Sequence, residues 1–443
     1  MSRRNDVMAL FDAYKEETDA KVNAGIEAYR KGTFDLKIKD KDGKEIKGAK
    51  VRAMLKNHDF RFGANLFMLD ELETDEKNAA YREDFAKLFN MATLPFYWNT
   101  LEPEKGKPRY AADSPKVYRR PSPDLCLEYC EEKHIEPREH ALAYCAHYPE
   151  WLDRHDVAEN KREMERHYRE IAERYASRID TIEVTNELFW GNLDDLPAIY
   201  KADDYLEFAF KLAEKYFPAN KLAINEWAGL WTERGMTVDP FYQYIENTML
   251  KGGRVDAIAL QYHMFHSRER EVAETRKYYD PRQLWRIMDL YAKFGKPLQI
   301  SEVTIPAYSG EKEDEALQAE ILTTLYKIWF SHPNMEQIIY WNLVDGYAFN
   351  AKPGDMTAGE NYYYGGLIRF DFSKKPAYDA LYNLIHKEWH TDESLITDEG
   401  GEARFRGFYG EYDVTVETEN GVYTLPLHAM KGRYGAYELK IGG

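Results

Sequence analysis

Short apolar segments alternate with longer amphipathic segments over most of this chain. The longer segments, such as 160–177 and 203–216, place apolar residues at helical spacing. Eight apolar segments lie between them, at residues 60–66, 91–98, 136–144, 179–187, 221–227, 255–263, 297–303 and 335–345. Eight alternations of strand and helix predict an α/β fold, a (β/α)8 TIM barrel over residues 60–390, with a last helix at 376–389.

A polar side chain ends nearly every predicted strand. These residues are His140, Glu187, Glu226, His263, Glu302 and Asp345. In a (β/α)8 barrel the C-terminal strand ends form the active face. Two long loops, 101–123 and 347–364, follow the second and eighth strands and are expected to shape a cleft at this face.

Two regions remain outside the barrel. Residues 1–32 predict an amphipathic N-terminal helix, whereas residues 33–59 and 391–443 alternate like strands. The segments Ile38–Ala49 and Thr397–Val416 resemble the two halves of a transthyretin-like or carboxypeptidase-regulatory-like β-sandwich. This resemblance implies one discontinuous accessory β-domain built from both ends of the chain. Two independent additions to the barrel are the alternative.

The composition excludes several classes of protein. The 443 residues carry a formal charge of −17, so a basic groove for nucleic acid is not expected. No apolar stretch approaches the ~20 residues of a membrane span. Three cysteines cannot form a disulfide scaffold and fit a reducing compartment. We therefore expect a cytoplasmic protein, or a secreted one if a signal peptide has been removed, with no membrane partner.

Two glutamates suggest the chemistry. Glu187 ends the predicted fourth strand and Glu302 the seventh, and these strands face each other across the mouth of a barrel. A carboxyl pair about 5–5.5 Å apart suits a retaining glycosidase, in which one carboxyl protonates the leaving oxygen and the other attacks the anomeric carbon. The alternative is that each glutamate caps a loop or pairs with an arginine.

Several motifs resemble glycoside hydrolase family 10, the endo-1,4-beta-xylanase family. The segment 182–187 (IEVTNE) resembles the family's W-D-V-V-N-E, and 300–303 (ISEV) resembles I-T-E-L. Segments 255–264, 140–151, 341–345 and 375–380 resemble four further family motifs. The resemblance spans residues 60–390 and implies that Glu187 is the acid/base, that Glu302 is the nucleophile and that His263 hydrogen-bonds the nucleophile. No cofactor and no metal are implied.

The sequence also departs from the family pattern. The family's E-N-E-M-K-W on strand two is replaced by residues 93–98 (TLPFYW), in which only Trp98 survives. Cys145 stands where the family has a second histidine, and Phe349 where it has a second tryptophan. Because polar contacts to sugar hydroxyls discriminate strongly, these changes predict a rebuilt glycone site beside intact cleavage machinery.

Further residues are candidates for substrate binding. Asn186 is placed to reach the sugar 2-hydroxyl, His140 and Asn225 to contact the substrate, and three aromatic residues to stack on pyranose rings. The aromatic candidates are Trp98, Trp341 and Tyr347. For each of them a purely structural role is the alternative.

The leading interpretation is a retaining β-glycosidase that acts on β-1,4-xylan or xylo-oligosaccharides. A retaining enzyme for another plant β-glycan or β-glycoside and a non-catalytic carbohydrate-binding barrel are the alternatives. Cys126, Cys130 and His134 have the spacing of one helix face, which would suit zinc. An apolar helix face that packs on the barrel is the simpler interpretation of these three residues.

Overall fold

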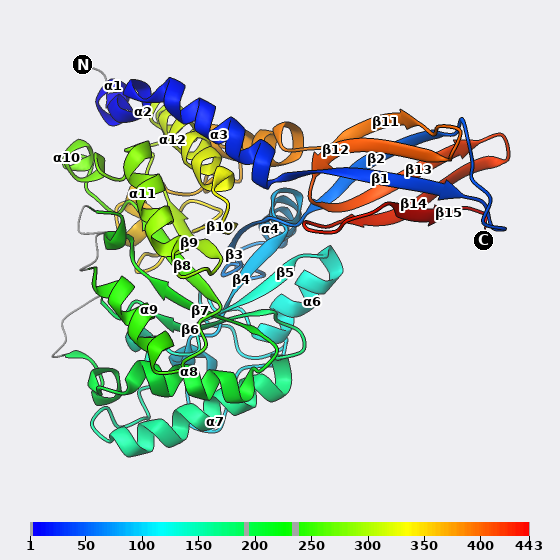
Figure 1. The fold of residues 1–443 in the computed structure, drawn as a ribbon. Coiled ribbons are helices and arrows are strands. Elements are labelled where there is room, and N and C mark those ends of the chain that lie inside the picture. The colour runs from blue at the N-terminus through cyan, green and yellow to red at the C-terminus, as the bar shows by residue number, and fades with distance from the viewer. Residues whose placement is uncertain (1–2, 190–194, 233–238, 443) are drawn as a thin grey trace.

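The computed structural model describes residues 3–189, 195–232 and 239–442 (Figure 1). Its centre is a closed barrel of eight parallel strands, in which each strand pairs with the next and the last pairs with the first. The predicted (β/α)8 fold is therefore confirmed. The strands are β3 (Arg61–Asn65), β4 (Met91–Pro95), β5 (Glu136–His140), β6 (Thr181–Asn186), β7 (Lys221–Glu226), β8 (Ala257–His263), β9 (Leu298–Thr304) and β10 (Met335–Tyr340).

The barrel strands are buried on both faces, which explains why they form nearly continuous apolar runs in the sequence. Every residue of β4, β6 and β9 is buried. Two predicted segments, 136–144 and 335–345, extend past their strands, because the chain leaves the sheet at His140 and Tyr340. The residues after these points form loops over the C-terminal face.

Helices cover the outside of the barrel (Figure 1). Two of them, α9 and α11, begin at an Asp-Pro pair, and the Asp239 and Asp280 carboxylates accept backbone N–H groups of the first turn. The barrel helices are α4 (Asp75–Leu88), α5 (Trp98–Leu101), α6 (Pro123–Lys133), α7 (Val157–Tyr175), α8 (Tyr205–Tyr216), α9 (Pro240–Leu250), α10 (Glu271–Thr275), α11 (Pro281–Ala292), α12 (Lys312–Ser331) and α13 (Pro376–Asn383). Short helical turns are η1 (Cys145–His147), η3 (Ala198–Lys201), η4 (Ala228–Trp231), η5 (Gly359–Tyr363) and η6 (Leu384–Glu388).

The predicted N-terminal helix is divided into three pieces, α1 (Arg3–Val7), α2 (Ala9–Ala13) and α3 (Lys15–Tyr29). The backbone leaves helical geometry at Met8 and Tyr14, whose ψ angles are 2° and 20°. The α3 helix packs against α12 (Figure 1). Gly25 allows this contact, since a Cβ there would overlap the carbonyl oxygen of Ser331.

Strands from both ends of the chain share two sheets beside the barrel (Figure 1). In one sheet β1 (Lys31–Lys39) lies between β12 (Glu402–Phe408) and β15 (Tyr437–Lys440). In the other, β2 (Lys50–His58) lies between β11 (Asp392–Ile396) and β13 (Gly410–Thr418), and β14 (Gly421–Ala429) follows at the edge. The domain boundaries at residues 33, 59 and 391 stay a prediction.

Two further observations concern membrane insertion and metal binding. Within the described residues, no helix combines the length and apolarity needed to span a bilayer. Cys126 and Cys130 lie buried on α6, and His134 ends that helix in the left-handed region. The described residues contain no group of three His, Cys, Asp or Glu side chains placed to hold a metal ion.

Candidate active site

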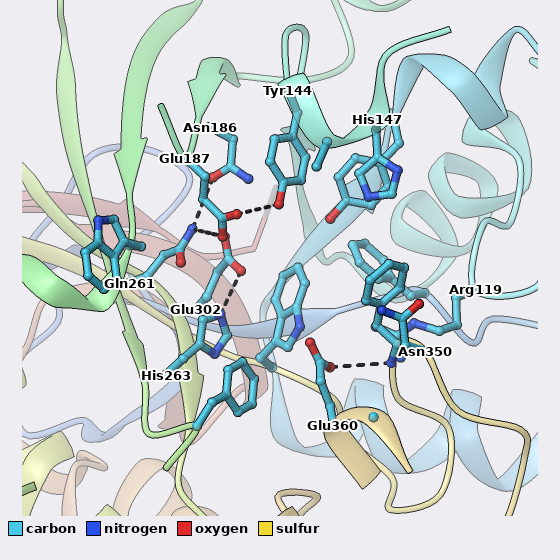
Figure 2. A pocket seen from close by; sticks show the side chains of 18 of the residues that line it. Arg119, Tyr144, His147, Asn186, Glu187, Gln261, His263, Glu302, Asn350 and Glu360 are labelled. Atoms are coloured by element: carbon cyan, nitrogen blue, oxygen red, sulfur yellow. Dashed lines mark hydrogen bonds and ion pairs between the residues drawn. The ribbon is translucent and has the colours of Figure 1, made fainter. Parts of the chain in front are cut away.

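Glu187 and Glu302 meet at the C-terminal mouth of the barrel, bridged by one amide. Gln261 Nε2 donates to Glu187 Oε1 and to Glu302 Oε1, at 3.0 Å in each case. The two oxygens therefore lie within about 6 Å of each other, a separation that fits the carboxyl pair of a retaining glycosidase. Figure 2 shows the three side chains side by side at one end of the pocket.

Polar side chains surround Glu302. Asn225 Nδ2 donates to Glu302 Oε1 at 3.0 Å, and His263 Nε2 lies 3.0 Å from Oε2. Ser301 Oγ donates to Asn225 Oδ1 at 2.7 Å, which fixes the orientation of that amide. His263 Nδ1 lies 2.9 Å from Thr304 Oγ1. These contacts hold Glu302 in place with both carboxylate oxygens aimed at polar partners.

Glu187 has a different environment. Burial, together with the nearby Glu302 charge, raises the pKa of Glu187, and hydrogen bonds from Tyr144 and Gln261 oppose this rise. A raised pKa keeps a proton on the carboxyl at pH values where an ordinary glutamate is ionised. Glu187 thus has the raised pKa that a general acid requires.

The backbone at Glu187 is strained. Its φ is +52°, in the left-handed region that costs a non-glycine residue on the order of 1–3 kcal/mol. The turn that follows is held by Glu226 at the end of β7, whose carboxylate accepts the N–H groups of Leu188, Phe189 and Trp227. Burial raises the pKa of Glu226 to about 8. Glu226 therefore positions the loop that carries Glu187.

A cavity of about 600 Å³ opens in front of the two glutamates. Asn186, Glu187, Gln261, His263 and Glu302 line one side of it. Flat aromatic faces, which suit sugar rings, make up much of the remaining wall. They are Phe67, Tyr97, Tyr144, Trp227, Phe265, Tyr278, Trp341, Phe349 and Tyr363.

The predicted site residues divide into two groups. Those that line the cavity are Glu187, Glu302, Asn186, His263 and Trp341. His140 and Asn225 are buried beneath the cavity instead, and Trp98 and Tyr347 are outside its lining. Of the six polar strand ends, only Glu187, His263 and Glu302 line the cavity.

His140 is saturated by protein contacts. Its Nδ1 lies 2.8 Å from Glu183 Oε1 and its Nε2 lies 2.9 Å from the Tyr97 hydroxyl. Burial would lower the pKa of His140, but the Glu183 carboxylate outweighs this effect and raises it. Because the ring is 1% exposed, His140 can influence a ligand only indirectly, through cavity-lining neighbours such as Tyr97 and Trp341.

Trp98 and Tyr347 do not provide the sugar platforms assigned to them in the sequence. The Trp98 indole stacks on His167 at 4.3 Å and donates to Glu102 at 3.0 Å. The Tyr347 hydroxyl bonds Glu73 at 2.5 Å. Trp98 opens helix α5 and Tyr347 follows the turn at Gly346, so neither continues a strand direction, and the alternation of side chains along a strand does not apply to them.

Sequence reasoning missed several residues that line the cavity. Gln261 stands in the segment that resembles a family motif, two positions before His263, so the strand period places both on one face. Tyr97 stands in segment 93–98, which departs from the family's strand-two motif. Arg119 and Arg120 lie in the long loop that was expected to shape the cleft, but no sequence pattern distinguishes them from the other basic residues there.

Comparison with known proteins adds to this geometry. A family model described as glycosyl hydrolase family 10 matches residues 52–384. The chain belongs to glycosyl hydrolase family 10.

Two curated relatives show how far the likeness extends. This family 10 chain is 24% identical over 422 residues to anti-sigma-I factor RsgI6 of Acetivibrio thermocellus, an alignment that covers 93% of this chain and 48% of the relative. It is 24% identical over 274 residues to endo-1,4-beta-xylanase B of Cellvibrio japonicus, covering 61% of this chain and 40% of the relative. The chain thus spans about half or less of the length of these relatives.

Solved family 10 structures share the fold. Native xylanase 10B from Thermotoga maritima superposes with a TM-score of 0.58 at 22% identity, covering 74% of this chain and 96% of that one. Xylanase 10B from Thermotoga petrophila RKU-1, solved in complex with xylobiose, gives 0.57 at 21% identity, with 74% and 95% coverage.

Proposed function

We propose that this family 10 chain is a retaining β-glycosidase that hydrolyses β-1,4-xylan or xylo-oligosaccharides. The observation that carries the proposal is the bridge from Gln261 to both Glu187 and Glu302 within one cavity. The relatives named endo-1,4-beta-xylanases and the xylobiose complex support a xylose-based substrate.

The reaction has two steps. Glu302 attacks the anomeric carbon and forms a glycosyl ester, while the Glu187 carboxyl gives its proton to the leaving glycosidic oxygen. Glu187, now a carboxylate, then takes a proton from water, which attacks the same carbon and releases Glu302. The second inversion at this carbon restores the β configuration.

The neighbouring residues have supporting roles. Asn225 and His263 contact Glu302 and orient it for attack. Asn186 lines the cavity beside the acid, where it can bond the sugar 2-hydroxyl as the transition state forms. Trp341 offers a flat apolar face to the sugar ring.

Hydrolysis assays test this proposal. The wild type should release the aglycone from aryl β-xylosides and shorten xylo-oligosaccharides. Glu302→Ala should lower kcat/KM at least about a thousandfold, since no other group replaces the nucleophile. Glu214→Ala, which removes an exposed glutamate of α8, is the matched control and should retain full activity. Full activity of Glu302→Ala would disprove the nucleophile assignment.

A second candidate keeps the mechanism and changes the sugar. Tyr97, which lies between β4 and α5, lines the cavity and stands in the segment where the family's Asn and Lys are absent. Activity on other aryl β-glycosides without activity on any xylose-containing substrate would favour this candidate. A protein that binds xylo-oligosaccharides and cleaves none would be the non-catalytic barrel.

A further inference from the structure

Two arginines lie on the cavity wall without a carboxylate partner. Arg119 and Arg120 stand in the loop between α5 and α6 and are only 3% and 6% exposed. In the described part of the chain, neither has a carboxylate oxygen within 4.0 Å. By contrast, the buried Arg138 in the barrel pairs with Glu183 at 2.6 Å.

Neutral groups hold the two guanidinium groups in place. Arg119 Nη1 donates to Asn342 Oδ1 at 2.8 Å and to the carbonyl oxygen of Tyr347. Arg120 Nη1 donates to the carbonyl oxygen of Arg119 at 2.8 Å. The Nε atoms of both arginines are buried and have no hydrogen-bond partner among the described residues. Donor capacity therefore remains after the protein contacts are satisfied.

Aromatic rings fix the position of Arg120. Its Cζ lies 4.1 Å from the centre of the Tyr97 ring and 5.1 Å from that of Phe67. Tyr97 and Phe67 line the same cavity. A stacked guanidinium keeps its edge free for hydrogen bonds in the ring plane, so the rings orient the group and leave its donors available.

Leaving two cations buried and unpaired is costly. Burying an ionised group without a partner costs several kcal/mol. Burial lowers the pKa of Arg120 to about 10, so this guanidinium stays charged near neutral pH. The cation thus remains unpaired in a chain with a formal charge of −17, which is rich in carboxylates.

Three carboxyl groups share the cavity with these arginines. Glu360 accepts from Asn342 Nδ2 at 3.1 Å and lies beyond ion-pair distance of both guanidinium groups. Glu187 and Glu302 stand at the other end of the pocket from Arg119 (Figure 2). Arg119 and the reacting pair thus line the same cavity from different sides.

We propose that Arg119 and Arg120 bind the carboxylate of a uronic acid unit, so that the preferred substrates are β-glycans carrying an acidic sugar close to the cleaved bond. This inference rests on the proposed function and specifies its substrate class. A guanidinium fork matches a carboxylate in two parallel hydrogen bonds, and Trp341 in the same cavity offers an apolar face for the sugar ring that bears it.

A competing explanation is that the arginines only offset the charges of Glu187, Glu302 and Glu360. That role would act on all substrates alike. Removing one arginine would then shift the pH profile for a neutral substrate and would leave the preference between neutral and acidic ligands unchanged. If the arginines bind a carboxylate, removing one of them should instead reduce the preference for the acidic ligand.

Binding measurements on a protein that cannot turn over separate these cases. Calorimetry on Glu302→Ala would compare a linear xylotriose with the same xylotriose carrying one glucuronic acid. We expect the acidic ligand to bind at least about tenfold more tightly, and added salt to weaken only its binding. Inorganic sulfate, titrated as a separate ligand, should bind only weakly because it lacks the sugar ring.

Arginine variants in the same Glu302→Ala background complete the test. Arg120→Met should reduce the preference to within about twofold, and Arg120→Lys, which keeps the charge and loses the fork, should restore part of it. Arg178→Met, at a partly exposed arginine paired with Glu131, is the control and should keep the preference. Thermal unfolding of each variant verifies folding.

The outcomes separate the two proposals. Equal or tighter binding of neutral xylotriose, sulfate binding as tight as that of the acidic sugar, or an unchanged preference in Arg120→Met would overturn the uronic acid site. If the wild type still hydrolysed xylosides, the proposed function would stand. If the acidic ligand bound tightly but the wild type cleaved no glycoside, the uronic acid site would stand and the proposed function would fall. If neither ligand bound and no glycoside were cleaved, both proposals would be overturned.

Discussion

Glu187 is subject to opposing influences at the scale of single residues. Burial and the Glu302 charge raise its pKa, whereas the Tyr144 hydroxyl, which donates to Glu187 Oε2, favours the ionised form. A general acid must hold its proton in the free enzyme, so with Glu187 in the proposed role we expect activity to fall as pH rises through its pKa. We also expect the Tyr144 contact, which favours the ionised form, to move this alkaline limit to lower pH.

Substituting Tyr144 tests this relation. Tyr144→Phe removes a hydrogen bond to the ionised form, so the pKa of Glu187 should rise further. The alkaline limb of the kcat/KM profile should move to higher pH, and the plateau value should fall by about tenfold or less.

The control for Tyr144→Phe is Tyr216→Phe. In the wild type the Tyr216 hydroxyl donates to Glu165 on the outside of the barrel. Its profile should match that of the wild type. An alkaline limb that moves to lower pH in Tyr144→Phe, or does not move, would show that Glu187 is not the group that titrates there.

Single residues of the site were predictable where they stand on strands. Asn186, His263 and Glu302 stand at the ends of strands, so their place at the barrel mouth follows from the fold. Tyr347 was not predictable, because its side chain direction depends on a turn at Gly346. Arg120 depends on a loop path that no local pattern fixes.

At the scale of elements, close approach of two helices determines which residues are tolerated. Gly25 lies inside α3, where glycine usually destabilises a helix by about 1 kcal/mol relative to alanine. Here it faces the carbonyl oxygen of Ser331, at the end of α12, without room for a Cβ. The tertiary contact thus outweighs the local preference of the helix.

Gly25→Ala should therefore destabilise the protein, by about 1–3 kcal/mol, although the same change in an exposed helix stabilises it. Thermal unfolding measures this effect. Asn23→Ala, at an exposed position of the same helix, is the control and should leave the midpoint unchanged or raise it slightly. A higher midpoint for Gly25→Ala would contradict the close packing of α3 on α12.

The order of elements was more predictable than their limits. All eight barrel strands lie within or next to the predicted segments, because buried parallel strands form apolar runs. The N-terminal helix was predicted as one element, and its apolar spacing did not reveal the breaks at Met8 and Tyr14. The association of the two chain ends was implied only by the resemblance of their segments to a β-sandwich, and the register of β1 with β12 comes from the structure.

At the scale of the whole molecule, an aromatic cluster joins the barrel to the strands beside it. The His58 ring, at the end of β2, lies within 5.4–6.3 Å of the rings of Phe62, Phe330 and Phe408. Trp389 stacks on Phe330 at 4.1 Å. Burial lowers the pKa of His58 from 6.5 to about 4, so the ring is neutral at the centre of this joint.

This buried histidine should make the protein sensitive to acid. The unfolded chain takes up a proton at His58 near pH 6.5 and the folded chain only near pH 4, so its contribution to stability is complete above pH 6.5 and is lost as pH falls toward 4. Between about pH 7 and pH 5 the free energy of unfolding should fall by about 2 kcal/mol more in the wild type than in His58→Phe.

Denaturant unfolding at the two pH values measures that difference. His155→Gln replaces an exposed histidine and should behave like the wild type. Equal acid sensitivity of the wild type and His58→Phe would show that His58 is protonated, or accessible to water, in the folded protein.

The proposed function requires that the whole molecule cleave glycosides through a covalent intermediate on Glu302. An activated 2-deoxy-2-fluoro-β-xyloside slows both steps by destabilising the oxocarbenium-like transition state, and its good leaving group lets the first step proceed. The glycosyl-enzyme should then accumulate. Mass spectrometry of the digested protein should find one fluoroxylosyl group, on the peptide that contains Glu302, and none in Glu302→Ala. An adduct on another residue, or hydrolysis of xylosides with inversion and no adduct, would contradict the account.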